Sequence, residues 1–207
     1  DLTVDNLYVS GGTPTVLSLT QWEKLLDVLN RYYLGSGTEF TVEAGRPDTL
    51  SGEVLQLLAA GGVNRMCVNP QTMNDETLIR VGRRHTVKMV RSGYELVRSA
   101  GIKHINMDLI VGLPGEGAAE FENSLQEVIR LKPESITVHH LAWKRGSVWQ
   151  MQEAAIEQNE ADIGTDTGSI MASAGYLSYY LYRQKYMTGN QENIGYALPG
   201  CFSIYNI

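Results

Sequence analysis

Cysteine is scarce in this chain, and its scarcity excludes two kinds of site. Only Cys67 and Cys201 occur among 207 residues. An iron–sulfur cluster needs three or four thiolates, so we expect the chain to supply no cluster by itself. A structural disulfide is not expected either, because no signal-peptide pattern opens the sequence. Cys67 lies in the apolar run 66–68 and is expected to be a small buried residue.

Basic charge and long apolar runs are also lacking. Lysine and arginine total 17 against 23 aspartates and glutamates, a net charge of −6, which argues against a nucleic-acid partner. No apolar run approaches the roughly 20 residues of a membrane helix, so no membrane span is expected. With 43% hydrophobic and 19% charged residues, the composition is that of a globular domain, and a cytoplasmic location is predicted.

The apolar residues that are present alternate between a period of 2 and a period of 3.6. This alternation predicts strands separated by helices, hence βαβ units in a parallel sheet, closed as a barrel or doubly wound. We expect strands at 7–9, 40–44, 63–68, 105–111 and 136–141, and a sixth at 177–183. The first helix is expected to start at one of two possible capping boxes, Ser18 with Gln21 or Thr20 with Glu23. Further helices are expected after Asn74 and Thr86 and at 51–60 and 117–131, with weak helical character at 153–175.

Both ends of the sequence run directly into predicted core elements. Asp1 leads at once into the first strand, and residues 202–207 form an apolar, strand-like run. A native terminus usually leaves some slack before its first core element. We therefore interpret residues 1–207 as one barrel fragment, truncated at both ends.

Polar residues gather where the predicted strands end, which is where parallel folds bind ligands. Glu43 and Asp108 lie in otherwise apolar strands, where an unpaired carboxylate is costly unless it meets a ligand or a partner. The alternative is a core carboxylate satisfied by an arginine. Gly11-Gly12 would let a ligand approach the backbone, although a plain tight turn is the alternative.

His139-His140 and the tyrosines at 176–182 are less informative. Adjacent strand residues point to opposite faces, so the two histidines are not expected to bind one metal ion, and no metal site is predicted. The tyrosines are expected to line the core and a groove.

Five ordered motifs resemble the oxygen-independent coproporphyrinogen III oxidases, also called dehydrogenases, which are radical S-adenosylmethionine proteins. The first is the strand 7–9 with Gly-Gly-Thr-Pro-Thr at 11–15, and the others are at 42–48, 64–65, 69–74 and 105–115. Residues 179–193 and 201–207 resemble the shorter coproporphyrinogen-dehydrogenase-like paralogues.

The resemblance implies an α/β fold, a partial (β/α)6 TIM-like barrel that here lacks its first strand. It also implies a Cys-x3-Cys-x2-Cys loop for a [4Fe–4S] cluster, whose ligands we expect outside this chain, within about 50 residues upstream, roughly one βα unit. Gly11 and Gly12 would contact the methionine end of S-adenosylmethionine, and Glu43 would also contact this cofactor. The residues matching a neighbouring pocket, where some members hold a second S-adenosylmethionine, are Thr13, Gln71, Arg83, Asp108 and Ala142.

Two departures from the family pattern leave detailed contacts open. Ser10 stands where other members have a third glycine, and 44–46 replaces the usual short turn after the glutamate. The resemblance assigns no catalytic residue.

The implied activity is oxidative decarboxylation of coproporphyrinogen III propionates to vinyl groups in haem biosynthesis. A porphyrinogen substrate and an electron donor for the cluster would then be the partners, and Arg83 or Arg84 could bind a propionate unless they are simply solvated. The fragment alone is expected to be inactive. Alternatives are a haem chaperone of the same superfamily, a radical enzyme with another substrate such as a methyltransferase, and an unrelated phosphate-binding barrel.

Overall fold

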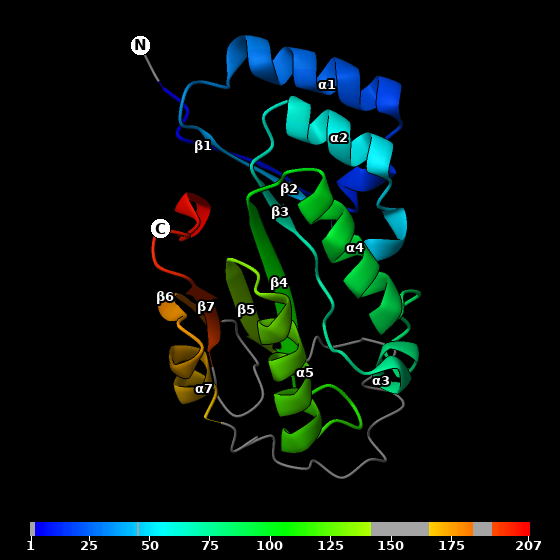
Figure 1. Ribbon diagram of the computed structural model, residues 1–207, viewed down its shortest axis with the longest axis vertical. Helices are drawn as coiled ribbons and strands as arrows, with labels where there is room; N and C mark the ends of the chain where they lie inside the picture. The colour runs from blue at the N-terminus through cyan, green and yellow to red at the C-terminus, as the bar shows by residue number, and fades with distance from the viewer. Residues whose placement is uncertain (1–2, 45, 142–165, 184–191) are drawn as a thin grey trace.

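The chain folds around one curved sheet, shown by a computed structural model (Figure 1). The structure describes residues 3–44, 46–141, 166–183 and 192–207. In these residues the sheet has seven strands in the order β1-β2-β3-β4-β5-β7-β6. The strands are β1 (Asn6–Val9), β2 (Glu39–Glu43), β3 (Arg65–Cys67), β4 (His104–Val111), β5 (Ser135–His140), β6 (Leu177–Tyr182) and β7 (Asn193–Ala197).

The first five strands are parallel, and helices connect them in sequence. The helices of the described part are α1 (Leu19–Tyr32), α2 (Gly52–Ala60), α3 (Asp75–Arg80), α4 (Val87–Ser99), α5 (Ala118–Leu131) and α7 (Thr167–Ser173), with short 3-10 turns η1 (Pro14–Val16), η2 (Pro47–Thr49) and η4 (Ile204–Asn206). Helices α1, α2, α4 and α5 all cover the same face of the sheet (Figure 1). The predicted alternation of strand and helix is therefore confirmed.

Side-chain caps start the helices where the sequence predicts them. Ser18 accepts a hydrogen bond from the backbone of Gln21, whose side chain bonds back to the Ser18 amide, a complete capping box. Asn74 and Thr86 act as simple N-caps: the Asn74 side chain accepts from the amides of Glu76 and Thr77 in α3, and the Thr86 side chain accepts from the amide of Met89 in α4.

The core lies between the sheet and these helices. In β4 the buried residues alternate with half-buried ones, so that Ile105, Met107, Leu109 and Val111 pack under the helices. Each such side chain contributes about 1.5–3 kcal/mol by leaving water. The other face of β4 carries Asn106 and Asp108 and points away from these helices. No helix among the described residues is long and apolar enough to cross a membrane.

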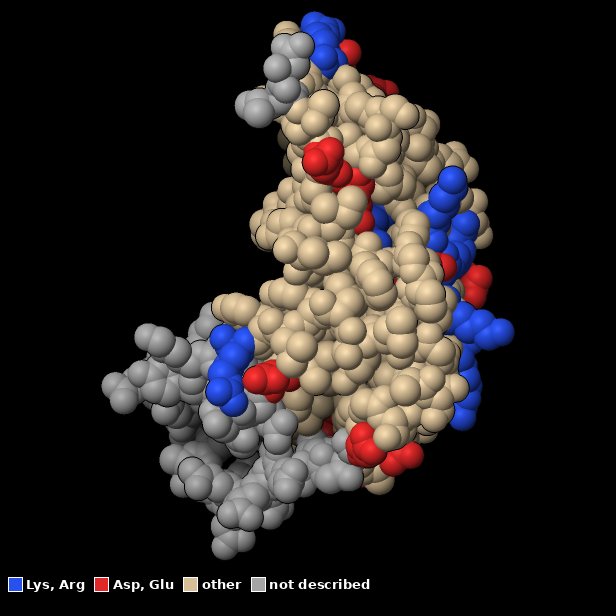
Figure 2. Space-filling model, turned by 90° about the vertical axis from the view of Figure 1, so that its left-hand side faces the viewer, with Lys and Arg blue, Asp and Glu red and all other residues tan. Residues whose placement is uncertain are grey.

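The uncovered face of the sheet forms the inside of a half-barrel, and the carboxyl-terminal segment crosses its open side. In η4, the ring of Tyr205 stacks on Tyr8 of β1 with 4.3 Å between ring centroids. The Asn206 side chain donates to the hydroxyl of Tyr179 in β6 at 3.1 Å. Since β1 and β6 are the two outermost strands of the sheet, this segment connects one side of the half-barrel to the other. Figure 2 shows the hollowed side of the molecule, where few lysines and arginines lie.

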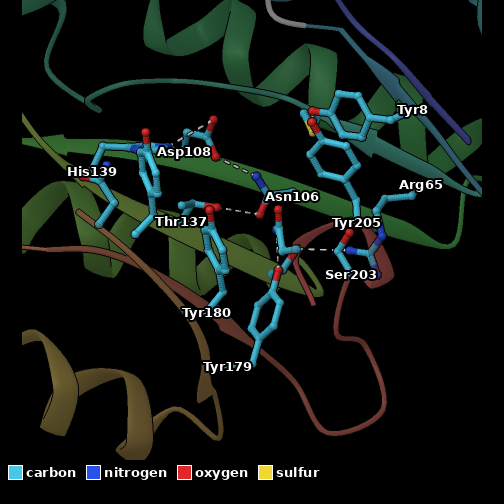
Figure 3. A pocket seen from close by; sticks show the side chains of 15 residues that line it. Tyr8, Arg65, Asn106, Asp108, Thr137, His139, Tyr179, Tyr180, Ser203 and Tyr205 are labelled. Atoms are coloured by element: carbon cyan, nitrogen blue, oxygen red, sulfur yellow. Dashed lines mark hydrogen bonds and ion pairs between the residues drawn. The ribbon is translucent and has the colours of Figure 1, made fainter. Parts of the chain in front are cut away.

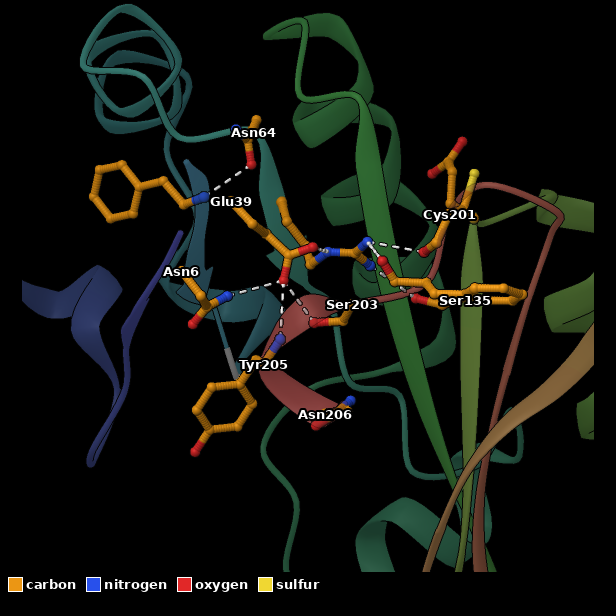
Figure 4. A network of polar contacts seen from close by, with 12 residues as sticks. Asn6, Glu39, Asn64, Ser135, Cys201, Ser203, Tyr205 and Asn206 are labelled. Carbon is orange, nitrogen blue, oxygen red and sulfur yellow. Dashed lines mark hydrogen bonds and ion pairs between the residues drawn. The ribbon is translucent and has the colours of Figure 1, made fainter. Parts of the chain in front are cut away.

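A buried polar network holds that segment in place (Figure 4). The guanidinium of Arg65, 3% exposed, pairs with Glu39 at 3.2 Å and donates to the Cys201 carbonyl at 2.8 Å. The other Glu39 oxygen accepts from Asn6 at 3.0 Å and from the Ser203 hydroxyl at 2.7 Å. With hydrogen bonds on both sides, the burial of this ion pair is compensated.

Three expectations need correction or restriction. The sheet is not purely parallel, because β7, which the sequence did not predict, runs antiparallel between β5 and β6. Residues 202–207 do not form a strand. They end in η4, because Ser203 and the amide of Tyr205 bond to Glu39 rather than to a neighbouring strand. Most of the weakly helical stretch 153–175 lies outside the described residues, and its end forms α7. The predicted α/β partial barrel itself is confirmed.

Candidate functional site

The residues predicted to bind a cofactor lie at the carboxyl ends of neighbouring strands. Gly11 and Gly12 follow β1, Glu43 ends β2, Gln71 follows β3, and Asp108 lies in β4. Because β1 to β4 are adjacent and parallel, their carboxyl ends meet at one edge of the sheet. The structure brings these predicted residues to that shared edge.

The glycine loop after β1 is open to a ligand. Gly11 and Gly12 have φ angles of +92° and +49°, and a Cβ added to either would meet no atom within 4 Å. The hydroxyl of Thr15 donates to the Ala44 carbonyl at 3.2 Å, which fastens the loop to the end of β2. Thr13 precedes η1 and does not use its side chain as a cap. The loop therefore offers accessible backbone groups on a fixed base.

Glu43 and Asp108 face the same side of the sheet and influence one another. Glu43 is paired in register with Cys67, which faces the inside of the half-barrel. Burial raises the pKa of Glu43, and the charge of Asp108 raises it further. Among the described residues, neither carboxylate has an arginine within ion-pair distance, so the alternative of an arginine-satisfied core carboxylate finds no support there. This pair of carboxylates favours a cationic ligand.

Gln71 adopts a rare backbone conformation beside Asp108. Its φ is +70°, a left-handed angle that costs a non-glycine residue roughly 1–2 kcal/mol. Two hydrogen bonds maintain it: the Gln71 amide donates to the Asp108 carbonyl at 3.0 Å, and the Gln71 carbonyl accepts from the Ile110 amide at 2.9 Å. Such local strain, stabilised by its surroundings, is characteristic of functional positions.

The two remaining predicted residues are Arg83 and Ala142. Arg83 lies in the loop between α3 and α4 and is exposed. Partial loss of solvent around its guanidinium, and then the charge of Arg46, lower the pKa of Arg83, so it lies within electrostatic reach of the loop after β2. Ala142 lies outside the described residues, and its predicted role stays a prediction.

A cavity of about 270 Å³ occupies the inner face of the sheet (Figure 3). Of the predicted cofactor-binding residues in the described part of the chain, only Asp108 lines it. Five tyrosines, called here the cavity tyrosines, form much of its wall: Tyr8, Tyr179, Tyr180, Tyr182 and Tyr205. The remaining lining residues are Arg65, Cys67, Asn106, Ser135, Thr137, His139, Asn193, Ser203 and Asn206.

A chain of polar side chains runs along one side of this cavity (Figure 3). The Thr137 hydroxyl donates to the Asn106 side-chain oxygen at 3.2 Å, and the Asn106 amide donates to Asp108 at 2.6 Å. The other Asp108 oxygen lies 3.7 Å from Nε2 of His139. Burial opposes the charge of this imidazole, but the Asp108 carboxylate outweighs burial and raises the pKa of His139.

Sequence reasoning identified part of this wall. Cys67 is buried as predicted, although it faces the cavity and contacts the Tyr8 hydroxyl at 3.7 Å. Burial raises the pKa of its thiol to about 12. His139 lines the cavity and His140 does not, as expected for adjacent strand residues. Asn106 was missed, although its position two residues before Asp108 places both on one face.

An open α/β half-barrel with a glycine loop and two carboxylates at the carboxyl ends of its strands carries its polar residues where barrel enzymes have their active sites. Residues 1–128 match the model of the Radical SAM superfamily, and the chain belongs to that superfamily.

Among curated relatives, the chain is 43% identical over 213 residues to the oxygen-independent coproporphyrinogen-III oxidase-like protein HemZ of Bacillus subtilis (strain 168), covering 100% of this chain and 42% of the relative. It is 35% identical over 181 residues to the heme chaperone HemW of the same organism, covering 84% of this chain and 48% of the relative. The chain thus spans about half the length of the curated relatives it matches.

The fold also matches a solved structure. Coproporphyrinogen III oxidase (HemN) from Escherichia coli, described as a radical SAM enzyme, superimposes with a TM-score of 0.78 at 24% identity, over 96% of this chain and 44% of that one. This likeness supports the fold that the motifs predicted.

S-adenosylmethionine and a [4Fe–4S] cluster are the cofactors of this superfamily. The sulfonium and ammonium groups of S-adenosylmethionine suit Glu43 and Asp108, and the open glycine loop leaves room for close approach. For a metal cluster the described residues offer no group of three or more histidines, cysteines, aspartates or glutamates. That the cluster ligands lie elsewhere stays a prediction.

Proposed function

We propose that this chain is the barrel portion of an oxygen-independent coproporphyrinogen III dehydrogenase-like enzyme of haem biosynthesis. The observation that carries the proposal is the placement of Glu43 and Asp108, without arginine partners in the described residues, at the edge that holds the open loop of Gly11 and Gly12. The 43% identity to an oxidase-like protein along the whole chain supports the same reading. We propose a cytoplasmic location.

In this proposal the chain binds and orients, and the cofactors carry the difficult chemistry. Bound S-adenosylmethionine, reduced by one electron from the cluster, would supply the radical chemistry that removes one hydrogen atom from a substrate propionate; the side chain would then lose CO2 and pass one electron to an external acceptor, which leaves a vinyl group. The glycine loop would hold the cofactor through its backbone groups, and Glu43 would hold it through its negative charge. The cavity tyrosines would contact the substrate and keep water away from the reacting side chain.

The test uses the longer protein that carries this chain, purified anaerobically with its cluster. Coproporphyrinogen III, S-adenosylmethionine and a reductant are supplied, and vinyl product is measured by mass spectrometry. We expect turnover in the wild type and a loss of about 100-fold or more in Glu43→Gln, since that carboxylate orients the cofactor. The exposed Asp27→Asn serves as the matched control. A protein with an intact cluster that yields no vinyl product would contradict the proposal.

A second candidate is a haem chaperone, favoured by the 35% identity to HemW over 84% of this chain. The cavity tyrosines and His139 would then contact haem itself rather than a reacting porphyrinogen. Titration with haem, followed by absorbance, distinguishes the two. Stoichiometric haem uptake without turnover would support the chaperone.

A further inference from the structure

His139 and Asp108 are diagonal neighbours on the inner face of the half-barrel. Asp108 and His139 come from adjacent parallel strands, and both side chains line the cavity. The Asp108 oxygen that faces His139 is not the one bonded to Asn106, so the carboxylate is held from two sides. The imidazole is the one group within ion-pair distance of Asp108 among the described residues.

We propose that His139 is a positioning residue that exchanges its proton for a cationic ligand at Asp108. The inference rests on the proposed function, which places a sulfonium- and ammonium-bearing cofactor at this edge. Protonated His139 neutralises Asp108 while no ligand is bound. A cation that approaches Asp108 takes over this role, and the imidazole then releases its proton.

Among the titratable groups around the cavity, His139 is the imidazole that faces Asp108. Glu43 on β2 lies within electrostatic reach of Asp108, and Arg65 at the other end of the cavity is paired with Glu39. Cys67 and Tyr8 have raised pKa values and stay uncharged, as does Tyr180 of β6. Burial lowers the pKa of the neighbouring His140, whose charge would otherwise oppose that of His139.

The affinity for a cation at Asp108 should depend on pH through His139. The pKa of His139 lies above its ordinary value because of Asp108, so at acid pH the carboxylate is already neutralised. As the pH rises through that pKa, Asp108 becomes available and a cation binds more tightly. The opposite dependence would be expected if His139 instead bound the carboxylate group of the ligand.

The experiment is calorimetric titration of the 207-residue chain with S-adenosylmethionine between pH 5.5 and 8.5, in buffers of differing ionisation enthalpy. We expect the affinity to rise with pH by no more than about tenfold per unit, the limit for release of one proton, and we expect that proton in the buffer comparison. S-adenosylhomocysteine, which lacks the sulfonium charge, should show a weaker dependence.

Variants separate a positioning role from a structural one. His139→Gln should bind with an affinity that no longer follows this rise, whereas His104→Gln should retain it, because His104 lies four residues from Asp108 along β4, about 13 Å away. The chain has four histidines, so proton NMR can follow each through a pH titration. In Asp108→Asn the pKa of His139 should fall, and in wild type it should fall when S-adenosylmethionine binds.

Different outcomes would overturn the exchange at His139 and the proposed function. Affinity that is independent of pH, or that rises toward acid pH, would overturn the exchange at His139 and leave the proposed function standing. Absence of S-adenosylmethionine binding to the chain at every pH would also overturn the exchange, whereas the proposed function would be overturned by absence of vinyl product from the longer protein with its cluster. An unchanged pKa of His139 in Asp108→Asn would overturn the pairing itself.

Discussion

Nε of Arg65 lies 3.2 Å from a carboxylate oxygen of Glu39, and this buried pair joins the amino ends of β2 and β3 to the carboxyl-terminal segment. The strands that carry the candidate site are therefore secured at the end opposite to it. Ligand-binding residues at one edge of the sheet depend on this anchoring at the other.

Breaking the anchor should be costly. Arg65→Met leaves the Glu39 carboxylate buried without its cation, and we expect a loss of about 3–5 kcal/mol in the free energy of unfolding. Urea denaturation measures it. The matched control is Arg31→Met, which breaks an exposed pair with Asp27 and should cost at most about 1 kcal/mol. Equal losses in the two variants would show that the buried pair is not an anchor.

The glycine loop can be tested through its backbone. Gly11→Ala introduces no clash, since nothing lies within 4 Å of the new Cβ, but its φ of +92° is unfavourable for alanine. We expect a loss of about 1–2 kcal/mol in stability and weaker binding of S-adenosylmethionine, measured by denaturation and calorimetry. Gly52→Ala, at the start of α2, is the control and should be neutral. Wild-type affinity in Gly11→Ala would show that the ligand does not approach this loop.

Ionisation of Glu43 should lower the free energy of unfolding as the pH rises. Its pKa is raised in the folded protein, so the native state binds more protons than the unfolded chain, and stability falls as the pH rises from the ordinary pKa to the raised one. Glu43→Gln should therefore be more stable than wild type at neutral pH while binding the cofactor less well. Denaturation at several pH values checks the first effect. A variant less stable than wild type at pH 7 would contradict this assignment.

The two thiols should differ in reactivity. Cys67 is buried against Tyr8, and its pKa is raised to about 12, so little thiolate exists near neutrality. Cys201 is half-buried, and burial raises its pKa as well. We expect a thiol reagent to label Cys201 before Cys67 in the native protein, and to label both thiols after unfolding. In Cys201→Ser the faster of the two labelling reactions should be lost. Faster labelling of Cys67 would show that the cavity opens readily.

Much of the architecture could be predicted from local patterns. The alternation of apolar periods located five parallel strands, and the capping residues Ser18, Asn74 and Thr86 marked helix starts, because both depend on residues near in sequence. The polar residues Glu43 and Asp108 stood out for the same reason, each being costly within an apolar strand. The antiparallel β7 could not be predicted, since its apolar pattern is short and its place depends on β5 and β6.

The sequence by itself determined the order of the first five strands and the helices between them, the helix caps and the motifs at the carboxyl ends of the strands. Tertiary structure alone decided what faces the cavity: Tyr8 from β1, His139 from β5, Tyr180 from β6 and Tyr205 from η4 meet there. The physical reason is that a residue's neighbours along a strand fix its face, whereas its partners across a cavity depend on how the sheet curves and closes. The proximity of Asp108 to His139 depends likewise on the register between β4 and β5, which the residues of either strand alone do not fix.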